Sequence, residues 1–300
     1  MTDTSFRVVR HSPATFRARA EPWLLENEAE HNLLLGLAAR LEESTAGYEP
    51  PIYLATIERG EGGERGDRDE RGERAGDIVG CAFRTPPFNL GITRLPAAAV
   101  EELAADVAQV YDSLRGVLGP AAEARALAAR WSELKGAAVR EHMRERIYVL
   151  ERVIPPGRAA PGRARTASEA DAGLVVSWVE AFAAEADAPA NMEQIRRLVK
   201  RGRILLWDDD GARSMAATGA DTPHGSRVGP VYTPPLWRGR GYATACVAEL
   251  SRRILAGGRR FCFLYTDLSN PTSNAIYQRI GYEPVSDVVD YRFEPATGIA

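Results

Sequence analysis

A short run of arginine and glycine in the last third of the chain has the composition of an anion-binding loop. The run Arg238-Gly239-Arg240-Gly241 follows an extended stretch that ends at Thr233, and it leads directly into a helical pattern from Tyr242. Glycines let backbone N–H groups approach an anion closely, and a helix N-terminus supplies positive partial charge. The two arginines add full charges. This segment therefore predicts a site for a di- or triphosphate group.

The spacing within this loop separates several classes of phosphate site. A P-loop needs Gly-x-x-x-x-Gly-Lys-Ser/Thr, and a dinucleotide fingerprint needs a third glycine where Thr244 stands. The pattern Arg/Gln-x-x-Gly-x-Gly/Ala is satisfied by Arg238, Gly241 and Ala243. On this pattern the segment resembles the GCN5-related N-acetyltransferase (GNAT) family. The resemblance implies that residues Arg238 to Thr244 hold the pyrophosphate of acetyl-coenzyme A.

A second segment, from Tyr265 to Tyr282, is similar to the final strand, loop and helix of the same family. Asn270, Asn274 and Tyr277 occur in the order that the family shows, followed by Gly281. The resemblance places these two asparagines and this tyrosine at the cofactor. Asn270 also suits a helix N-cap and Gly281 a helix stop, so both are expected to be structural as well. Asn274 and Tyr277 share one helix face and are expected to line the cofactor channel.

The predicted role of Tyr277 follows from the chemistry of acyl transfer. Acetyl transfer to an amine passes through a tetrahedral intermediate that expels the CoA thiolate, and a phenol with an ordinary pKa of about 10 is a suitable proton donor to that sulfur. Tyr277 matches the general acid of the family. The alternative is a half-buried packing residue.

The extended stretch before the loop, Val228 to Thr233, resembles the cofactor strand of the family. By this resemblance, the backbone of Val231, Tyr232 and Thr233 would pair with the pantetheine arm. The N–H groups of Val231 and Thr233 would polarise the thioester carbonyl. The glycine and proline of this stretch equally suit a sheet edge or bulge.

A general base is harder to identify from the residues. Glu185 is the candidate, because in the family the corresponding helix end borders the acceptor site. The competing interpretation is a solvated carboxylate in the run Glu185-Ala186-Asp187. Tyr232 and Asp221 are weaker alternatives.

The pattern around these residues predicts an α/β (α+β) fold with two tandem GNAT-like domains, each a mixed, mostly antiparallel sheet flanked by helices. In the second half, helices are expected from Ser168 to a helix end at Glu185 and over 190–201, 242–256 and 271–280, with strands over 163–167, 204–207, 212–220, 228–233 and 260–266 and after Gly281. In the first half, helices are expected over 22–42, 97–115 and 121–136, with strands over 52–57, 78–83, 91–95 and 146–153.

The domain boundary is predicted in the Pro/Gly-rich linker from Pro155 to Gly162, which gives domains 1–156 and 157–300. The first would be a degenerate copy, because Thr93-Arg94-Leu95-Pro96 stands where the glycine loop is expected. The second would be catalytic. Residues 59–77, almost wholly Gly, Glu, Arg and Asp, are expected to form a flexible charged loop.

Composition excludes some classes of function. With 38 basic and 41 acidic residues the formal charge is −3, which gives no general attraction to nucleic acid or membrane. The three cysteines are expected to be buried, reduced thiols of a cytoplasmic protein, and the four histidines show no metal-ligand spacing. A monomer or homodimer is expected.

The sequence thus predicts direct, metal-free transfer from acetyl-CoA to an unidentified primary amine acceptor. Two alternatives remain open: a non-catalytic acyl-CoA sensor or partner-binding protein, and acyl transfer to a hydroxyl or thiol.

Overall fold

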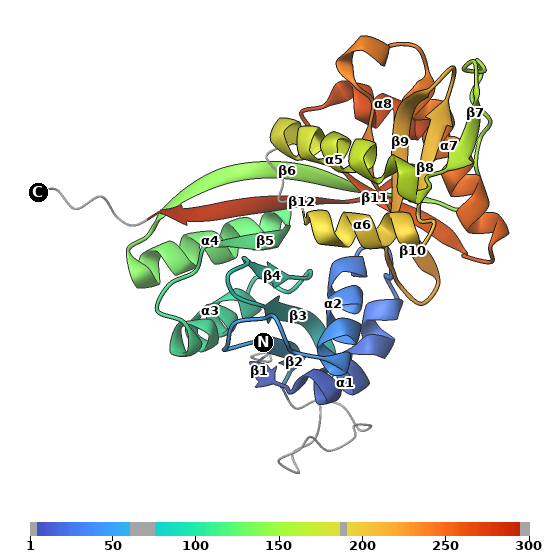
Figure 1. Ribbon diagram of the computed structural model, residues 1–300. Coiled ribbons are helices and arrows are strands. Elements are labelled where there is room, and N and C mark those ends of the chain that lie inside the picture. Colours follow the sequence, from blue (N-terminus) through green and yellow to red (C-terminus); the bar gives the residue numbers. More distant parts are fainter. Residues whose placement is uncertain (1–4, 61–75, 187–190, 295–300) are drawn as a thin grey trace, which may run out of the picture. The chain divides into compact units, whose positions relative to one another are not determined.

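The computed structural model describes residues 5–60, 76–186 and 191–294. It divides the chain into two compact units, of which unit 1 comprises the residues up to Glu145 together with those from Ser286 onward, and unit 2 comprises Arg146–Val285. Each unit is a mixed α/β structure (Figure 1). Of the predicted loop 59–77, residues 61–75 lie outside the described parts.

The first ten elements along the chain are β1 (Phe6–Arg10), α1 (Pro13–Leu25), α2 (Asn32–Glu43), β2 (Tyr53–Arg59), β3 (Ile78–Arg84), β4 (Leu90–Ile92), α3 (Ala99–Val110), β5 (Gly116–Pro120), α4 (Ala121–Lys135) and β6 (Ala138–Leu150). In unit 1 the strand order is β1-β2-β3-β4-β5-β12, where β12 is the last strand of the chain. Only β4 and β5 are parallel among the pairs of this series.

The next ten elements are β7 (Arg163–Thr166), α5 (Ala172–Ala186), α6 (Met192–Lys200), β8 (Ile204–Asp208), β9 (Ala212–Asp221), β10 (Gly225–Tyr232), α7 (Tyr242–Ala256), β11 (Phe261–Asp267), α8 (Pro271–Arg279) and β12 (Glu283–Glu294). In unit 2 the order β7-β8-β9-β10-β11 is antiparallel except for the parallel pair β10 and β11. Short 3₁₀ turns, Glu169–Asp171 and Pro235–Trp237, precede α5 and α7.

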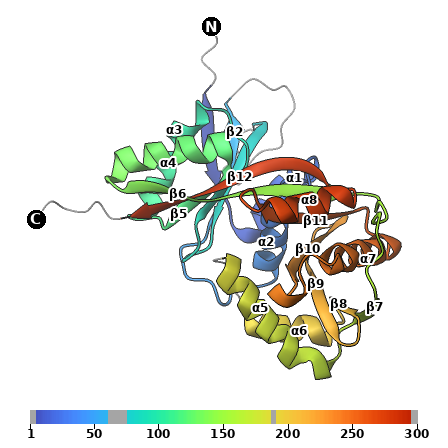
Figure 2. The same ribbon diagram turned by 90° about the horizontal axis from the view of Figure 1, so that it is seen from above.

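The helices of unit 2 cover its sheet on both faces, because successive residues of a strand point to opposite sides. Leu205 and Ala216 pack with residues of α7 and α8, whereas Leu206 and Met215 pack with residues of α5 and α6. Figure 2 shows the two helix pairs on opposite sides of strands β8 to β11. Unit 1 repeats this arrangement, with α1 and α2 in one hydrophobic cluster and α3 and α4 in another.

The two series of ten elements have the same order of strands and helices. This agreement confirms the predicted tandem α/β fold with mostly antiparallel sheets. The compact units, however, do not follow a single cut at residues 156 and 157, because Val288 to Arg292 of β12 pair with Pro120 to Gly116 of β5. The assignment of 1–156 and 157–300 as a degenerate and a catalytic domain stays a prediction.

The first copy differs from the sequence prediction at α1 and α2, at β1, at β5 and at β6, which begins at Ala138 and not at residue 146. The expected helix over 22–42 is two helices, α1 and α2, and the Nδ1 atom of His31 contacts the carbonyl of Leu24 at 2.9 Å between them. Strand β1 was not predicted, and β5 was missed because Gly, Pro and Leu dominate it. Its glycines are needed for close packing, since a Cβ on Gly119 would lie 2.8 Å from the carbonyl oxygen of Ile92.

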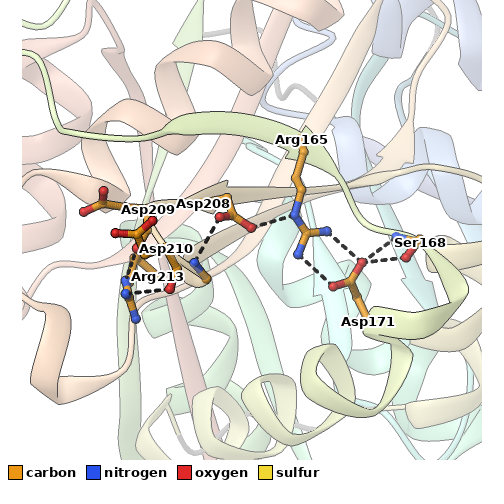
Figure 3. A network of polar contacts seen from close by, with 8 residues as sticks. Arg165, Ser168, Asp171, Asp208, Asp209, Asp210 and Arg213 are labelled. Atoms are coloured by element: carbon orange, nitrogen blue, oxygen red, sulfur yellow. Dashed lines mark hydrogen bonds and ion pairs between the residues drawn. The ribbon is translucent and has the colours of Figure 1, made fainter.

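Arg165 joins three elements at the start of the second copy. Its guanidinium donates to both carboxylate oxygens of Asp171 at 2.8 Å and to Asp208 at 2.8 Å (Figure 3). Asp171 also accepts hydrogen bonds from the N–H and the hydroxyl of Ser168, both at 2.8 Å. Ser168 is the N-cap of this turn and Asp171 is the N3 residue of its capping box. This network fixes β7, the start of α5 and the end of β8.

We expect Asp171→Asn to lower the free energy of unfolding by about 1–2 kcal/mol at pH 7, because it removes a helix cap and a charge-assisted pair. This value allows for solvent screening, which weakens the ion pair at the partly exposed Arg165. Hydrogen bonds from Arg165 hold the pKa of the Asp171 carboxyl well below its usual range. This stabilisation is thus complete above the unfolded pKa of about 4 and disappears as the pH falls toward the folded value.

Denaturant unfolding of both proteins between pH 7 and pH 2 measures this difference, which should shrink on acidification. Glu169→Gln is the matched control, because Glu169 is exposed in the same turn. An effect of Asp171→Asn that grew at low pH would contradict the assignment.

Candidate functional site

The predicted anion loop is a left-handed turn that opens directly onto α7. Gly239 and Gly241 have φ angles of 75° and 86°, a region that residues with a Cβ avoid, and Gly241 is the N-cap of the helix. Within the described residues no side chain caps this helix end. The first N–H groups of α7 are therefore available to an anion, with the positive end of the helix dipole behind them.

Arg238, at the start of this loop, contacts the predicted general base. Its Nη2 atom lies 2.8 and 2.7 Å from the two carboxylate oxygens of Glu185, at the end of α5. Its Nε atom donates to the carbonyl of Thr233 at 2.8 Å, and the hydroxyl of Tyr232 donates to Glu185 at 3.3 Å. The structure thus brings together a predicted cofactor residue and the predicted base, which are both half exposed.

The cofactor strand diverges from its parallel neighbour. β10 pairs with β11 only at Gly225 to Arg227, opposite Phe261 to Phe263, although both strands continue beyond these residues. Its other edge pairs with β9, where the register shifts twice around Gly229, whose φ is 141°. Val231 and Tyr232 stand opposite Ala216 and Met215 of β9. Beyond Arg227 the described part of β10 has no strand partner on the β11 side, as the predicted pantetheine pairing requires.

Tyr277 lies on α8 in the hydrophobic cluster that also contains Val228. Its side chain is 9% exposed, and its ring is 5.8 Å from that of Tyr282 and 6.5 Å from that of Tyr148. Burial raises the pKa of its hydroxyl to about 12. This hydroxyl has no hydrogen-bond partner among the residues that the structure describes. The hydroxyl is therefore protonated and free to donate, and its role as general acid stays a prediction.

The two asparagines have structural contacts. Asn270 is the N-cap of α8 and accepts from the N–H of Ser273 at 3.0 Å. The amide of Asn274 donates to the carbonyls of Asp267 at 2.9 Å and Asn270 at 2.7 Å, and its oxygen accepts from the hydroxyl of Tyr148 at 3.1 Å. Both amide hydrogens of Asn274 are thus used within the protein. The direct cofactor roles of the two residues remain predictions.

The two weaker candidates for the base are disfavoured by their surroundings. Burial would raise the pKa of Asp221, but hydrogen bonds from Arg203 and Ser226 outweigh it and lower that pKa. Asp221 also lies 3.2 Å from Arg259. Burial and the charge of Glu185 raise the pKa of the Tyr232 hydroxyl, which keeps it protonated.

Two residues near the loop, Arg213 and Trp237, were not among those predicted from the sequence. The guanidinium carbon of Arg213, on β9, lies 3.7 Å from the centre of the Trp237 ring, and that of Arg240 lies 5.0 Å from the same ring. The hydroxyl of Tyr242 donates to Asp209 at 2.6 Å and ties the loop to the β8–β9 hairpin. Arg213 belongs to a hairpin without a motif, so no local signal indicated that it meets the loop.

Other functional features can be stated briefly. The three cysteines are free and buried, as predicted. Over the described ranges, no three His, Cys, Asp or Glu side chains are grouped as metal ligands. None of the helices in those ranges is both long and apolar enough to cross a bilayer.

Comparison with known proteins gives one family model and many solved structures. Residues 209–291 match the model of the FR47-like proteins, while no curated protein matches the chain. A Drosophila protein is 15% identical over 97% of this chain and 99% of its own, with a TM-score of 0.64. A GCN5-related N-acetyltransferase from Sphaerobacter thermophilus is 18% identical over 96% and 95%, with a TM-score of 0.59. A tandem GNAT protein from the clavulanic acid biosynthesis pathway is 12% identical over 99% and 100%, with a TM-score of 0.51.

Proposed function

We propose that this protein, which has the tandem GNAT fold, is an N-acetyltransferase that moves an acetyl group from acetyl-CoA to a primary amine. One observation carries the proposal. A glycine loop with an uncapped helix end follows a strand that diverges from its parallel neighbour. The loop suits a pyrophosphate and the unpaired strand edge suits an extended amide-containing arm, which are the two parts of CoA that precede its thioester.

The residues of unit 2 divide the reaction between them. N–H groups of the loop and of the first turn of α7 bind the pyrophosphate, and backbone N–H groups near Val231 and Thr233 polarise the acetyl carbonyl. The amine nitrogen adds to the carbonyl carbon to form a tetrahedral intermediate, and the C–S bond breaks when this intermediate collapses. Tyr277 gives its proton to the sulfur, which leaves as a thiol, and the amine proton passes to a base.

Glu185 is the proposed base, and its contact with Arg238 suggests how it is controlled. In the structure the carboxylate is paired with that guanidinium at 2.7 Å. A pyrophosphate in the loop would compete for Arg238 and leave the carboxylate free to accept a proton. On this account the cofactor binds before the base becomes available.

A non-catalytic acyl-CoA sensor is the second candidate, and the burial of Tyr277 among aromatic rings is the observation that favours it. Acyl transfer to a hydroxyl or thiol uses the same donor site and differs only in the acceptor.

Release of free thiol from acetyl-CoA, screened over amines, alcohols, thiols and peptides, tests the proposal. Turnover with amines is expected. The cysteines of the protein are buried, so they should give little background with a thiol reagent. Binding of acetyl-CoA without turnover of any acceptor would favour the sensor, and absence of binding would refute the donor site.

A further inference from the structure

Two arginines share one indole ring beside the glycine loop. Arg213 projects from β9 just after the β8–β9 hairpin, and Arg240 stands between the two left-handed glycines. Both guanidinium carbons lie within 5.0 Å of the centre of the Trp237 ring, at 3.7 and 5.0 Å. Stacking on an aromatic face restricts a guanidinium and leaves its edge open for hydrogen bonds.

Neither arginine forms an ion pair with another residue that the structure describes. Arg213 donates from Nε and Nη2 to the backbone carbonyls of Asp209 at 2.7 Å and Asp210 at 2.9 Å, so its contacts orient the guanidinium without pairing its charge (Figure 3). The carboxylate of Asp209 accepts from Tyr242 instead. In the described ranges neither Arg213 nor Arg240 has a carboxylate partner within ion-pair distance. Arg238, by contrast, is paired with Glu185.

Two unpaired cations beside a helix N-terminus repel each other until an anion joins them. A phosphate monoester is suited to this position, because it has nearly two negative charges at pH 7 and three oxygens that can accept from both guanidinium groups. CoA bears such a group, the 3′-phosphate of its ribose. The same ribose is attached to the pyrophosphate that the loop is proposed to hold.

We propose that Arg213 and Arg240, stacked on Trp237, bind the 3′-phosphate of CoA and thereby select CoA over dephospho-CoA. This inference rests on the proposed function, since it places CoA in the loop. Arg213 and Trp237 are then specificity-determining residues that the loop motif does not include.

Calorimetric titration of the full chain with CoA and with dephospho-CoA tests this inference without an acceptor. The wild-type protein is expected to bind CoA at least about tenfold more tightly, because hydrogen bonds to charged groups have this strength. In Arg213→Gln and in Arg240→Gln the ratio of the two dissociation constants should fall, and in the double variant it should approach one. Arg201→Gln, an exposed arginine of the α6–β8 turn, is the charge-matched control and should keep the wild-type ratio.

The ratio separates this inference from the proposed function. Equal binding of the two ligands by the wild-type protein would overturn the inference and leave the CoA site intact, and so would a double variant that kept the full preference. Failure of both ligands to bind would overturn the proposed function as well. Thermal melting of each variant verifies folding, and Trp237→Leu, which removes the stacking surface and leaves both charges, should lower the ratio to an intermediate value.

Discussion

Tyr277→Phe is expected to lower kcat for acetyl transfer by about 10²- to 10⁴-fold, the usual contribution of a positioned general acid. The affinity for acetyl-CoA should change little, because the ring that packs against Tyr148 and Tyr282 is retained. Removal of this hydroxyl also leaves no buried partner unsatisfied in the described part of the chain. Steady-state kinetics with an acceptor from the screen, together with calorimetric binding, separates the two effects.

The pH dependence gives a second measurement on the same residue. A general acid must be protonated, so the rate falls as the pH rises through its pKa, which burial raises to about 12 in Tyr277. Tyr277 should therefore cause no alkaline decline below about pH 11. Tyr282→Phe is the control: it deletes a buried hydroxyl that is 2.8 Å from Ser251, which should lower the melting temperature while kcat stays within about threefold. Unchanged kcat in Tyr277→Phe would remove the residue from the reaction.

Arg238→Glu is expected to abolish the stabilisation of the protein by acetyl-CoA. A ligand at one hundred times its dissociation constant stabilises the native state by about 2.7 kcal/mol, which raises the melting temperature by several degrees. The glutamate would place a negative charge at the pyrophosphate loop and beside Glu185. Thermal melting with and without acetyl-CoA measures the loss.

Glu185→Gln is the matched control, because it removes the same ion pair and keeps the cation. The partners are each 47% exposed, so the loss of the pair should cost less than about 1 kcal/mol. Stabilisation by acetyl-CoA should persist in this variant, whereas turnover should fall if Glu185 is the base. A wild-type shift in Arg238→Glu would contradict the proposed pyrophosphate site.

Most helices and strands of the scaffold could be predicted, because caps, helix starts and hydrophobic periodicity are visible in short stretches of sequence. Helix α7 begins at the residue after Gly241, and α8 begins at Pro271 after the Asn270 cap, as predicted. β5 could not be found this way, because its Gly and Pro residues have low strand propensity. Contacts with β4 and β12 decide its conformation. At the break between α1 and α2, the His31 side chain contacts the carbonyl of Leu24.

The candidate site likewise has features that neighbouring residues determine and contacts that only the fold determines. The anion loop and the Tyr277 helix follow from contiguous residues, because a glycine with positive φ, a helix cap and a helix start each depend on a few neighbours. The pairing of Arg238 with Glu185 joins residues 53 positions apart, and Arg213 reaches Trp237 from another hairpin. Packing and strand register set such distances.

By itself, the sequence therefore determined the α/β class, the tandem arrangement, the order of elements in the second copy, the glycine loop and the position of the predicted acid. Only the tertiary structure decided that the predicted base is paired with the loop arginine, that two further cations share the Trp237 ring, and that β10 separates from β11 after Arg227. The physical reason is that local conformation depends on near neighbours in the chain, whereas charge pairing and strand divergence depend on which elements the folded sheet places side by side.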